Sequence, residues 1–409
     1  MGQNLDINYV RSLFPAFSEK ELAGKAFFEN AGGSYTSSFV IDRLLRFYKS
    51  RKVQPYGFYP VSELAGAEMD EARSRLSAMM NIKSESLSFG PSTTQNTYVI
   101  AQAFSQTYKK GDAIIVTDQD HEANSGFWRR LEKFGYEIRE WKLRPDNGTL
   151  EIEDLKKLLD GNVRLVSFPH CSNIVGSPNS AEEICRIIHE FGAFSCVDGV
   201  SYAPHGFPNL KKMGPDIYVF SSYKTYGPHL GLMYLSKKLR DYLPNQGHYF
   251  NSDNPALKFT PAGPDHAQIA SAAGMADYVD ALHKHHFSDD VKPYIRAERI
   301  HTLQRNYERE ICAPLVDFLS SRNDIKLLGP KDNYKKVPTL ALDVGARAVS
   351  IARDLAKFNV MAGAGDFYAV RTLKSLGVKS STGVLRLSFV HYTREEEVEL
   401  LINSLRRIL

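Results

Sequence analysis

The sequence predicts an α/β protein in which a mostly parallel sheet lies between helices and a smaller α+β domain follows. Between residues 83 and 235, short runs rich in apolar and β-branched residues alternate with stretches typical of amphipathic helices. Strands and helices in such alternation imply parallel strands with helices on both faces of the sheet. After residue 264 the pattern changes to longer helical stretches with only a few strands among them.

The predicted elements divide the chain into two domains. Strands are expected at residues 112–118, 136–143, 163–170, 193–200 and 216–224, with helices at 126–135, 149–161 and 180–192. Further helices are expected at 266–287 and 294–319, and a small α+β unit at 339–345, 349–360 and 384–409. The large domain should span residues 20–285. Residues 1–19 and 286–409 should form the small one, with an N-terminal helix packed against it.

Composition excludes several classes of protein. The 409 residues carry a formal net charge of only +4 and no basic block, so nucleic-acid binding is not expected. No apolar run is long enough for a membrane span, and no signal peptide is visible. The four cysteines lack metal-ligand spacing, which argues against a metal site and against disulfides and favours a reducing, cytoplasmic setting.

Polar residues gather where the predicted strands end. Ligands of parallel sheets bind beyond the carboxyl ends of the strands, and residues 118–121, 170–173, 198–201 and 221–224 occupy those ends. Lys224 stands there within the sequence FSSYKTYGPHLG. A partly buried amine with a lowered pKa is what Schiff-base formation requires. A surface loop lysine is the alternative, and the convergence of four polar strand ends favours the site.

An aspartate and a lysine at neighbouring strand ends, with the pattern SxxKxYGP around the lysine, resemble the class V aminotransferase family. These are fold-type I pyridoxal 5'-phosphate (PLP) enzymes, and the resemblance is strongest to the cysteine desulfurase and selenocysteine lyase branch. It extends from FENAGGS near the start of the chain to VLRLSFVHY near its end. It implies a seven-stranded sheet, PLP as the cofactor, an amino acid as the substrate and a homodimer.

The resemblance assigns three catalytic residues. Lys224 would bind PLP covalently and later move protons, and Asp198 would pair with the pyridine nitrogen. A carboxylate there keeps the ring protonated, so that the ring accepts electrons when a bond to the substrate Cα breaks. His121 would stack on the ring. A turn aspartate and a surface histidine are the corresponding structural alternatives.

Other residues match the remaining contacts of the cofactor. Thr93 and Thr94 open a predicted helix, whose N-terminus is a natural phosphate site, although the same residues suit a helix cap. Ser221 matches a second phosphate ligand of the family. Asn173 matches an asparagine near the phenolic oxygen of PLP. Ser201 and Tyr223 replace a glutamine and a histidine common in the family.

Two residues would bind the substrate in a cleft between the domains. Arg386 lies on an alternating strand, and the resemblance gives it the α-carboxylate as partner, held by a bidentate fork. A structural salt bridge is the alternative. Asn30 matches a family stretch that lines the same cleft, although it could be a turn residue.

The sequence departs from the desulfurase pattern. Desulfurases carry a nucleophilic cysteine on a loop before the strand of the carboxylate-binding arginine, and residues 361–383 contain none. Cys171 is the only cysteine near a predicted strand end. A phosphate-binding threonine from the neighbouring subunit aligns with Gly263, and His266 or Gln268 would take over its role.

The glycine-rich stretch MAGAGDFYA suggests a flexible loop that approaches the substrate. Asp366, Tyr368 and Arg371 are its candidates for recognition of the substrate side chain. The same stretch could instead be a connection from a strand to a helix.

The resulting expectation is a PLP-dependent enzyme that acts on an amino acid, as a Cβ–S or Cβ–Se lyase by β-elimination. Transamination and epimerisation remain open, because related enzymes share these motifs. A non-catalytic PLP-binding protein is the alternative from another class. A nucleotide-binding module is disfavoured because the glycine-rich phosphate-binding sequences are missing.

Overall fold

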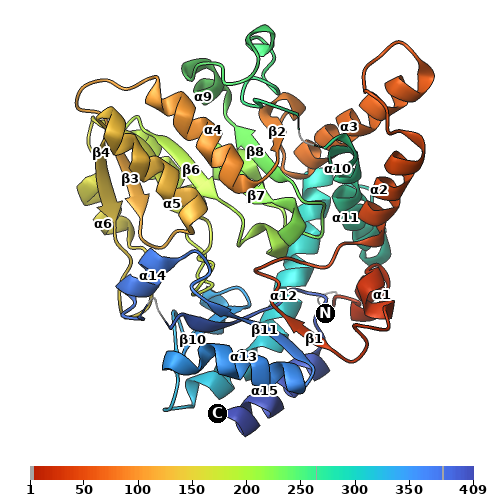
Figure 1. Ribbon diagram of the computed structural model, residues 1–409, viewed down its shortest axis with the longest axis vertical. Coiled ribbons are helices and arrows are strands. Elements are labelled where there is room, and N and C mark those ends of the chain that lie inside the picture. The colour runs from red at the N-terminus through yellow and green to blue at the C-terminus, as the bar shows by residue number, and fades with distance from the viewer. Residues whose placement is uncertain (1–3, 264, 380–381) are drawn as a thin grey trace.

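The protein contains two sheets with a long helix between them. The computed structural model describes residues 4–263, 265–379 and 382–409. Within these residues the strands form one sheet of seven and one of five, and α12 (Pro293–Ser320) runs from one to the other (Figure 1). The large sheet occupies the upper part of Figure 1 and the small sheet the lower part. The predicted α/β class of the fold is confirmed.

The large sheet is mostly parallel. It contains β2 (Leu87–Gly90), β3 (Ala113–Thr117), β4 (Glu137–Trp141), β5 (Val163–Pro169), β6 (Phe194–Asp198), β7 (Ile217–Ser221) and β8 (Gly231–Leu235). Their order is β2-β8-β7-β6-β5-β3-β4. Each neighbouring pair from β4 to β7 is parallel, whereas β8 runs antiparallel to both β7 and β2. β2 and β8 lie outside the five strand ranges expected from the apolar runs, and they bring the sheet to the seven strands that the resemblance implies.

Helices cover both faces of this sheet. They are α2 (Ser38–Ser50), α3 (Pro60–Met79), α4 (Thr93–Ser105), α5 (Glu122–Arg129), α6 (Ile152–Leu158), α7 (Ala181–Glu190), α8 (Leu210–Met213), α9 (Lys237–Tyr242), α10 (His266–Ser271) and α11 (Ala273–His286). Successive residues of β3 point to opposite faces of the sheet. Ile114 packs in one apolar cluster with residues of α4 and α5, and Ile115 packs in another with residues of α7.

The helix predicted at 126–135 differs from the observed one. α5 begins earlier, directly after His121, because that side chain caps the helix. Its last predicted turn is a 3-10 helix (Arg130–Phe134) that ends at Gly135, where φ is 103°. The cap therefore fixes the position of His121 at the end of β3.

The small sheet includes a strand from near the N-terminus. Its order is β1 (Ala26–Phe28), β11 (Val360–Gly365), β12 (Val384–Ser388), β10 (Thr339–Asp343) and β9 (Lys326–Leu327), with α13 (Ala348–Lys357), α14 (Val370–Ser375) and α15 (Glu395–Ile408) beside it. β1 is parallel to β11. A boundary at residue 20 assigns β1 to the large domain, whereas its backbone pairs with the small sheet. The predicted domain bounds do not follow this pairing.

The N-terminal helix α1 (Ile7–Ser12) contacts the last helix of the chain. Arg11 Nη1 lies 2.9 Å from Glu397 Oε2 and donates to the Tyr392 carbonyl at 2.9 Å. The predicted contact of this helix with the C-terminal part is confirmed. α1 also contacts the end of α11, where the rings of Tyr9 and His285 stack at 3.8 Å between centroids.

The start of α4 lies directly against β8, and a glycine permits this approach. A Cβ at Gly231 would lie 2.6 Å from the Thr93 nitrogen and would overlap the backbone of Ser92. Backbone atoms of a strand and a helix start cannot turn aside as a flexible side chain can. Glycine at position 231 therefore fixes where the N-terminus of α4 meets the edge of the sheet.

Replacing this glycine should destabilise the protein. Gly231→Ala is expected to lower the free energy of unfolding by about 1–3 kcal/mol, because overpacking strains the neighbouring backbone. Gly161→Ala is the control, since a Cβ there meets nothing within 4 Å, and its effect should stay within about 0.5 kcal/mol. Urea unfolding midpoints of both variants measure the difference. Equal midpoints would contradict the close approach.

Candidate active site

Ser222 fixes the conformation of the loop that carries Lys224. β7 ends at Ser221, and a 3-10 turn (Ser222–Lys224) follows. The Ser222 hydroxyl hydrogen-bonds to the carbonyl oxygens of Pro228 and Leu230, and its own carbonyl accepts from the Thr225 N–H at 2.7 Å. The small hydroxylated residues around the lysine thus hold its backbone at the end of the strand.

The residues predicted to contact PLP meet in one narrow cleft. Those that line it are Thr93, Thr94, His121, Asn173, Asp198, Ser201, Ser221, Tyr223 and Lys224, together with Ala123, Pro169, Cys171 and Val200. The cleft opens into a wider cavity of about 640 Å³ that shares six of these residues and adds Arg386. Side chains from β3, β5, β6 and β7 strand ends and from the small sheet therefore face one space.

Burial brings the pKa of Lys224 close to neutrality. Removal of water from around the ammonium, aided by repulsion from Arg386, lowers the pKa of Lys224 to about 8, although the carboxylate of Asp198 opposes the shift. A substantial fraction of this amine is therefore uncharged, and nucleophilic, near neutral pH.

Asp198 is a buried carboxylate with a single hydrogen-bond donor among the described residues. The Val200 N–H donates to Oδ1 at 2.8 Å. Burial raises the pKa of Asp198 to about 6, against the effects of the Val200 N–H and of Lys224. The carboxylate is therefore largely ionised at neutral pH, and its second oxygen is open to a further donor.

His121 is held neutral with a defined tautomer. Its Nδ1 accepts a hydrogen bond from the Ala123 N–H at 3.0 Å, as the cap of α5. Burial, together with the positive charges of Lys224 and Arg386, lowers the pKa of His121 to about 3. Since Nδ1 is an acceptor, the ring proton is assigned to Nε2.

The N-terminus of α4 offers an anion site at one end of the cleft. Its first backbone N–H groups have no acceptor within the helix, and the helix dipole favours negative charge there. Thr93 Oγ1 and Ser221 Oγ lie 2.8 Å apart, so two hydroxyls face the same spot. Thr94 is exposed at the mouth of the cleft. These groups suit a phosphate.

Arg386 lies in β12 at the wall of the wider cavity. Its Nη1 donates to the Asn173 carbonyl at 3.3 Å, and its guanidinium lies 3.7 Å from the ring centroid of Phe367. Burial lowers the pKa of Arg386 to about 10, with Glu29 opposing the shift. Its Nε is buried without an acceptor among the described residues. This oriented cation can accept a carboxylate.

Asn30 supports the cavity from behind. Its Nδ2 donates to the Ser388 carbonyl at 3.3 Å, and the Tyr392 hydroxyl donates to its Oδ1. Asn30 itself is not among the residues that line the cavity, whereas its neighbours Glu29, Ala31 and Gly32 are. Its amide is occupied in positioning this segment, and Glu29 is a cavity residue that the sequence patterns did not single out.

The glycine-rich stretch is a connection from β11 to α14, as the second of its two interpretations predicted. Phe367 and Tyr368 have positive φ angles of 51° and 55°, which residues other than glycine rarely adopt. The Asn173 amide donates to the Phe367 carbonyl at 3.0 Å, and the Glu122 N–H donates to that of Tyr368 at 2.8 Å. These bonds hold the Tyr368 ring 5.4 Å from that of His121.

The remaining candidate residues line neither the cleft nor the wider cavity. Asp366 accepts a hydrogen bond from the Tyr368 N–H at 2.9 Å, so it shapes the turn. Arg371 Nε lies 3.6 Å from Glu122 Oε2. His266 and Gln268 lie in α10 and do not line the cleft or the wider cavity of the single chain. Their role in a neighbouring subunit stays a prediction.

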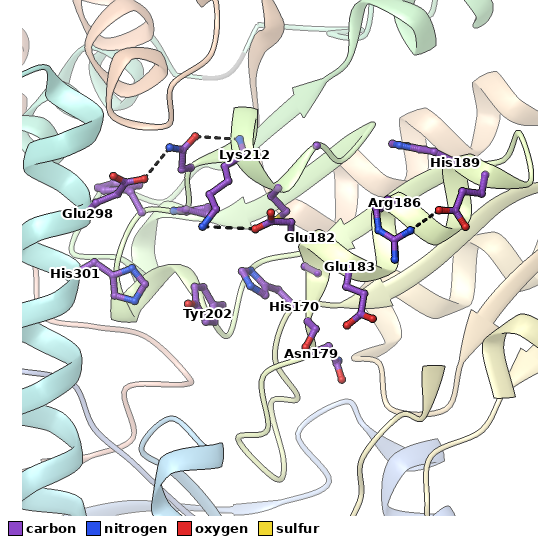
Figure 2. A pocket seen from close by; sticks show the side chains of 18 residues that line it. His170, Asn179, Glu182, Glu183, Arg186, His189, Tyr202, Lys212, Glu298 and His301 are labelled. Atoms are coloured by element: carbon purple, nitrogen blue, oxygen red, sulfur yellow. Dashed lines mark hydrogen bonds and ion pairs between the residues drawn. The ribbon is translucent and has the colours of Figure 1, made fainter. Parts of the chain in front are cut away.

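A second depression, of about 1100 Å³, is lined by residues that follow β5 and β6 and by residues of α7 and α12 (Figure 2). His170 and Tyr202 stack at 3.7 Å between ring centroids and form part of its wall. Four of its charged side chains form two ion pairs, Lys212 with Glu182 at 3.7 Å and Arg186 with Glu190. Its lining residues do not include those of the cleft, and they offer no comparable set of open chemical groups.

The described residues contain neither a helix suited to cross a membrane nor a cluster suited to a metal ion. Among the helices in the described ranges, none has the length and apolar content that crossing a bilayer requires. Nor do histidine, cysteine, aspartate and glutamate side chains of those ranges form a cluster suited to a metal ion.

Comparison with known proteins identifies the family. Residues 26–288 match the family model described as aminotransferase class-V. The chain belongs to the class V aminotransferase family. It is 31% identical to the aminotransferase-like protein FGM3 of Gibberella zeae, over 100% of both chains, and 27% identical to a cysteine desulfurase of Shigella sonnei, over 98% of each. The resemblance seen in the sequence is confirmed, and the chain is an enzyme of a PLP-dependent family.

Solved structures agree with this fold. The apo structure of a cysteine desulfurase from Thermococcus onnurineus has a TM-score of 0.84 at 22% identity, over 100% of this chain and 98% of that one. The cysteine desulfurase CsdA of Escherichia coli has a TM-score of 0.82 at 20% identity, over 98% of each chain.

The cysteines of this chain do not provide the exposed nucleophilic thiol of the desulfurase pattern. All four cysteines are buried and form no disulfide. Cys171 lines the floor of the cleft, but burial raises its pKa to about 12. A thiol held protonated in this way is a poor nucleophile. The chain therefore lacks a thiolate suited to accept sulfur.

Thiol labelling tests this conclusion. Ellman's reagent should react with no cysteine of the native protein on the timescale of minutes and with all four after unfolding in guanidinium. Rapid reaction of one thiol in the native protein, lost in Cys171→Ser, would contradict the buried, protonated state of this residue.

Proposed function

We propose that this chain binds PLP through Lys224 and cleaves a Cβ–S or Cβ–Se bond of an amino acid by β-elimination. The proposal rests on one observation: the Lys224 amine lines both the cleft that holds the Asp198 carboxylate and the start of α4, and the wider cavity that holds the Arg386 guanidinium. These groups are complementary to the aldehyde, ring nitrogen and phosphate of PLP and to the α-carboxylate of an amino acid. The buried Asn173 Oδ1, which has no donor among the described residues, also suits a polar ligand in the cleft.

The cofactor would be held at three places. Lys224 would bind it covalently, and Asp198 would hold a proton on the ring nitrogen. Thr93, Thr94 and Ser221 would bind the phosphate at the start of α4. His121 would lie against the ring, while Asn173, Ser201 and Tyr223 would complete the polar lining. When bound, PLP accepts the electron pair left on the substrate α-carbon after a bond to it breaks.

The residues of the chain would then position the substrate and move protons. Arg386, already oriented by the Asn173 carbonyl and the Phe367 ring, would bind the α-carboxylate. Lys224, with a pKa of about 8, would take the α-proton once its amine is free. The neutral His121 can donate a hydrogen bond from Nε2 without adding charge.

Buried thiols favour elimination over persulfide formation. Without a thiolate acceptor, sulfur or selenium would leave Cβ as sulfide, selenide or a substituted thiol, and water would then release pyruvate and ammonia. Transamination and epimerisation would use the same residues. A screen of amino acids for pyruvate, thiol or another keto acid therefore distinguishes elimination from transamination, while inversion at Cα without any of these products indicates epimerisation. Release of a different keto acid without a thiol would contradict β-elimination.

We also propose a homodimer, as the family resemblance implies. Exposed aromatic side chains support an interface. Phe58 is fully exposed, and Tyr249 and Phe250 are 86% and 68% exposed. Exposed aromatic residues of this kind are typical of protein–protein contacts.

Removal of the central amine should abolish the visible absorption of the protein. Lys224→Ala is expected to lose the absorption band at about 420 nm that PLP gives when bound to a lysine. Lys212→Ala, on the exposed side chain of α8, is the matched control and should retain it. The same band in both variants would contradict the assignment of Lys224.

The rate of cofactor uptake should follow the ionisation of Lys224. The uncharged amine is the attacking form, so uptake of PLP by the cofactor-free protein should rise with pH around the Lys224 pKa of about 8 and then level off. Stopped-flow absorbance between about pH 7 and 9.5 measures it across this titration. A rate that is flat or falls over this range would contradict the lowered pKa.

A further inference from the structure

Glu29 places a second charge beside the arginine in the wider cavity. It follows β1, and its backbone bridges to Ser388, two residues beyond Arg386. Its side chain lines the cavity. Neither a hydrogen bond nor an ion pair involves its carboxylate within the part of the chain that the structure describes.

Two glycines make room for this carboxylate. A Cβ at Gly363 would overlap Glu29 Oε1, and a Cβ at Gly32 would lie 3.6 Å from the same oxygen. Gly363 is the residue paired with Arg386 between β11 and β12. The carboxylate therefore occupies the space over the strand position directly beside the arginine.

The two charges share the cavity without neutralising each other. Their attraction is reflected in the pKa of Arg386, yet they form no ion pair within 4 Å. Arg386 instead contacts the Asn173 carbonyl and the Phe367 ring. When an α-carboxylate binds Arg386, Glu29 is left as a like charge beside it, which is unfavourable in a partly buried site.

A positive group on the substrate resolves this conflict. On the basis of the proposed function, we propose that Glu29 selects amino acids whose side chain ends in a cation, such as an ammonium or a guanidinium. The Phe367 and Tyr368 rings beside the cavity suit such a group as well. The cation would compensate Glu29 while the α-carboxylate compensates Arg386.

The other charges of the cavity agree with this selection. Arg130 lies in the cavity wall, 4.8 Å from the ring centroid of Phe127, and Glu122 of the same wall lies 3.6 Å from Arg371, which is not a lining residue. A cationic side chain at Glu29 leaves both arginines with these contacts. A substrate carboxylate at Arg130 would leave Glu29 uncompensated beside a second bound carboxylate.

Three cysteine derivatives of similar size test the inference on the PLP-loaded protein. S-(2-aminoethyl)-L-cysteine carries a cation, S-propyl-L-cysteine is its neutral counterpart and S-carboxymethyl-L-cysteine carries an anion. Dissociation constants from the rapid change in PLP absorbance, read by stopped flow before turnover, should favour the aminoethyl compound over the propyl compound by about tenfold or more. The carboxymethyl compound should bind weakest. Pyruvate release is measured in parallel and reports separately on the proposed elimination.

Matched variants identify the residue responsible. Glu29→Gln keeps the size of the side chain and should reduce the aminoethyl-to-propyl preference to about twofold or less, while the propyl compound binds equally well or better. Glu29→Asp should keep part of the preference, and Arg130→Gln should leave it unchanged.

The outcomes separate this inference from the proposed function. Equal binding of the three compounds, a preference for the carboxymethyl compound, or an unchanged preference in Glu29→Gln would overturn the role of Glu29. The predicted preference without pyruvate release would support Glu29 and overturn β-elimination. Absence of binding by all three would overturn both.

Discussion

Two opposite charges held out of water at adjacent strand ends are the constraint on which this active site depends. Asp198 ends β6, and Lys224 follows the end of β7, the next strand in the sheet. Burial moves both pKa values toward neutrality, to about 6 and about 8. Such groups are costly to bury, so the surrounding backbone has to be rigid. The Ser222 hydroxyl and the Val200 N–H provide that rigidity on the two loops.

The connection between β11 and α14 completes the site from the small sheet. Two aromatic residues of this connection, Phe367 and Tyr368, adopt left-handed backbone conformations. The strain is offset by hydrogen bonds from Asn173 and from the Glu122 backbone. These bonds thus hold two aromatic residues next to His121 and Arg386.

Much of this arrangement could be predicted from the sequence because it is local. Apolar runs specified the parallel strands, and a parallel sheet places their polar ends at one edge, which brought Lys224, Asp198 and His121 together. The start of α4 followed from its threonines. Contacts between distant segments could not be predicted in this way. β1 pairs with β11 more than 330 positions later in the chain, so nothing local indicated which sheet it joins.

The same limit explains why the sequence pointed to Asn30 as a cavity residue and not to its neighbour Glu29. Which of these neighbours faces the cavity depends on Tyr392 and Ser388, which bond Asn30, and on Gly363, which leaves space for Glu29. A lowered lysine pKa also does not by itself mark the site. Burial lowers the pKa of Lys336 to about 8 as well, yet its Nζ is enclosed without a hydrogen-bond partner among the described residues and does not line the cleft.

The most direct measurement is therefore to locate the covalent attachment of the cofactor. Reduction of the PLP-loaded protein with borohydride, followed by peptide mass mapping, should find the phosphopyridoxyl group on Lys224 and on no other lysine. Attachment at Lys336 or at a surface lysine, or a protein that takes up no PLP, would contradict the central claim.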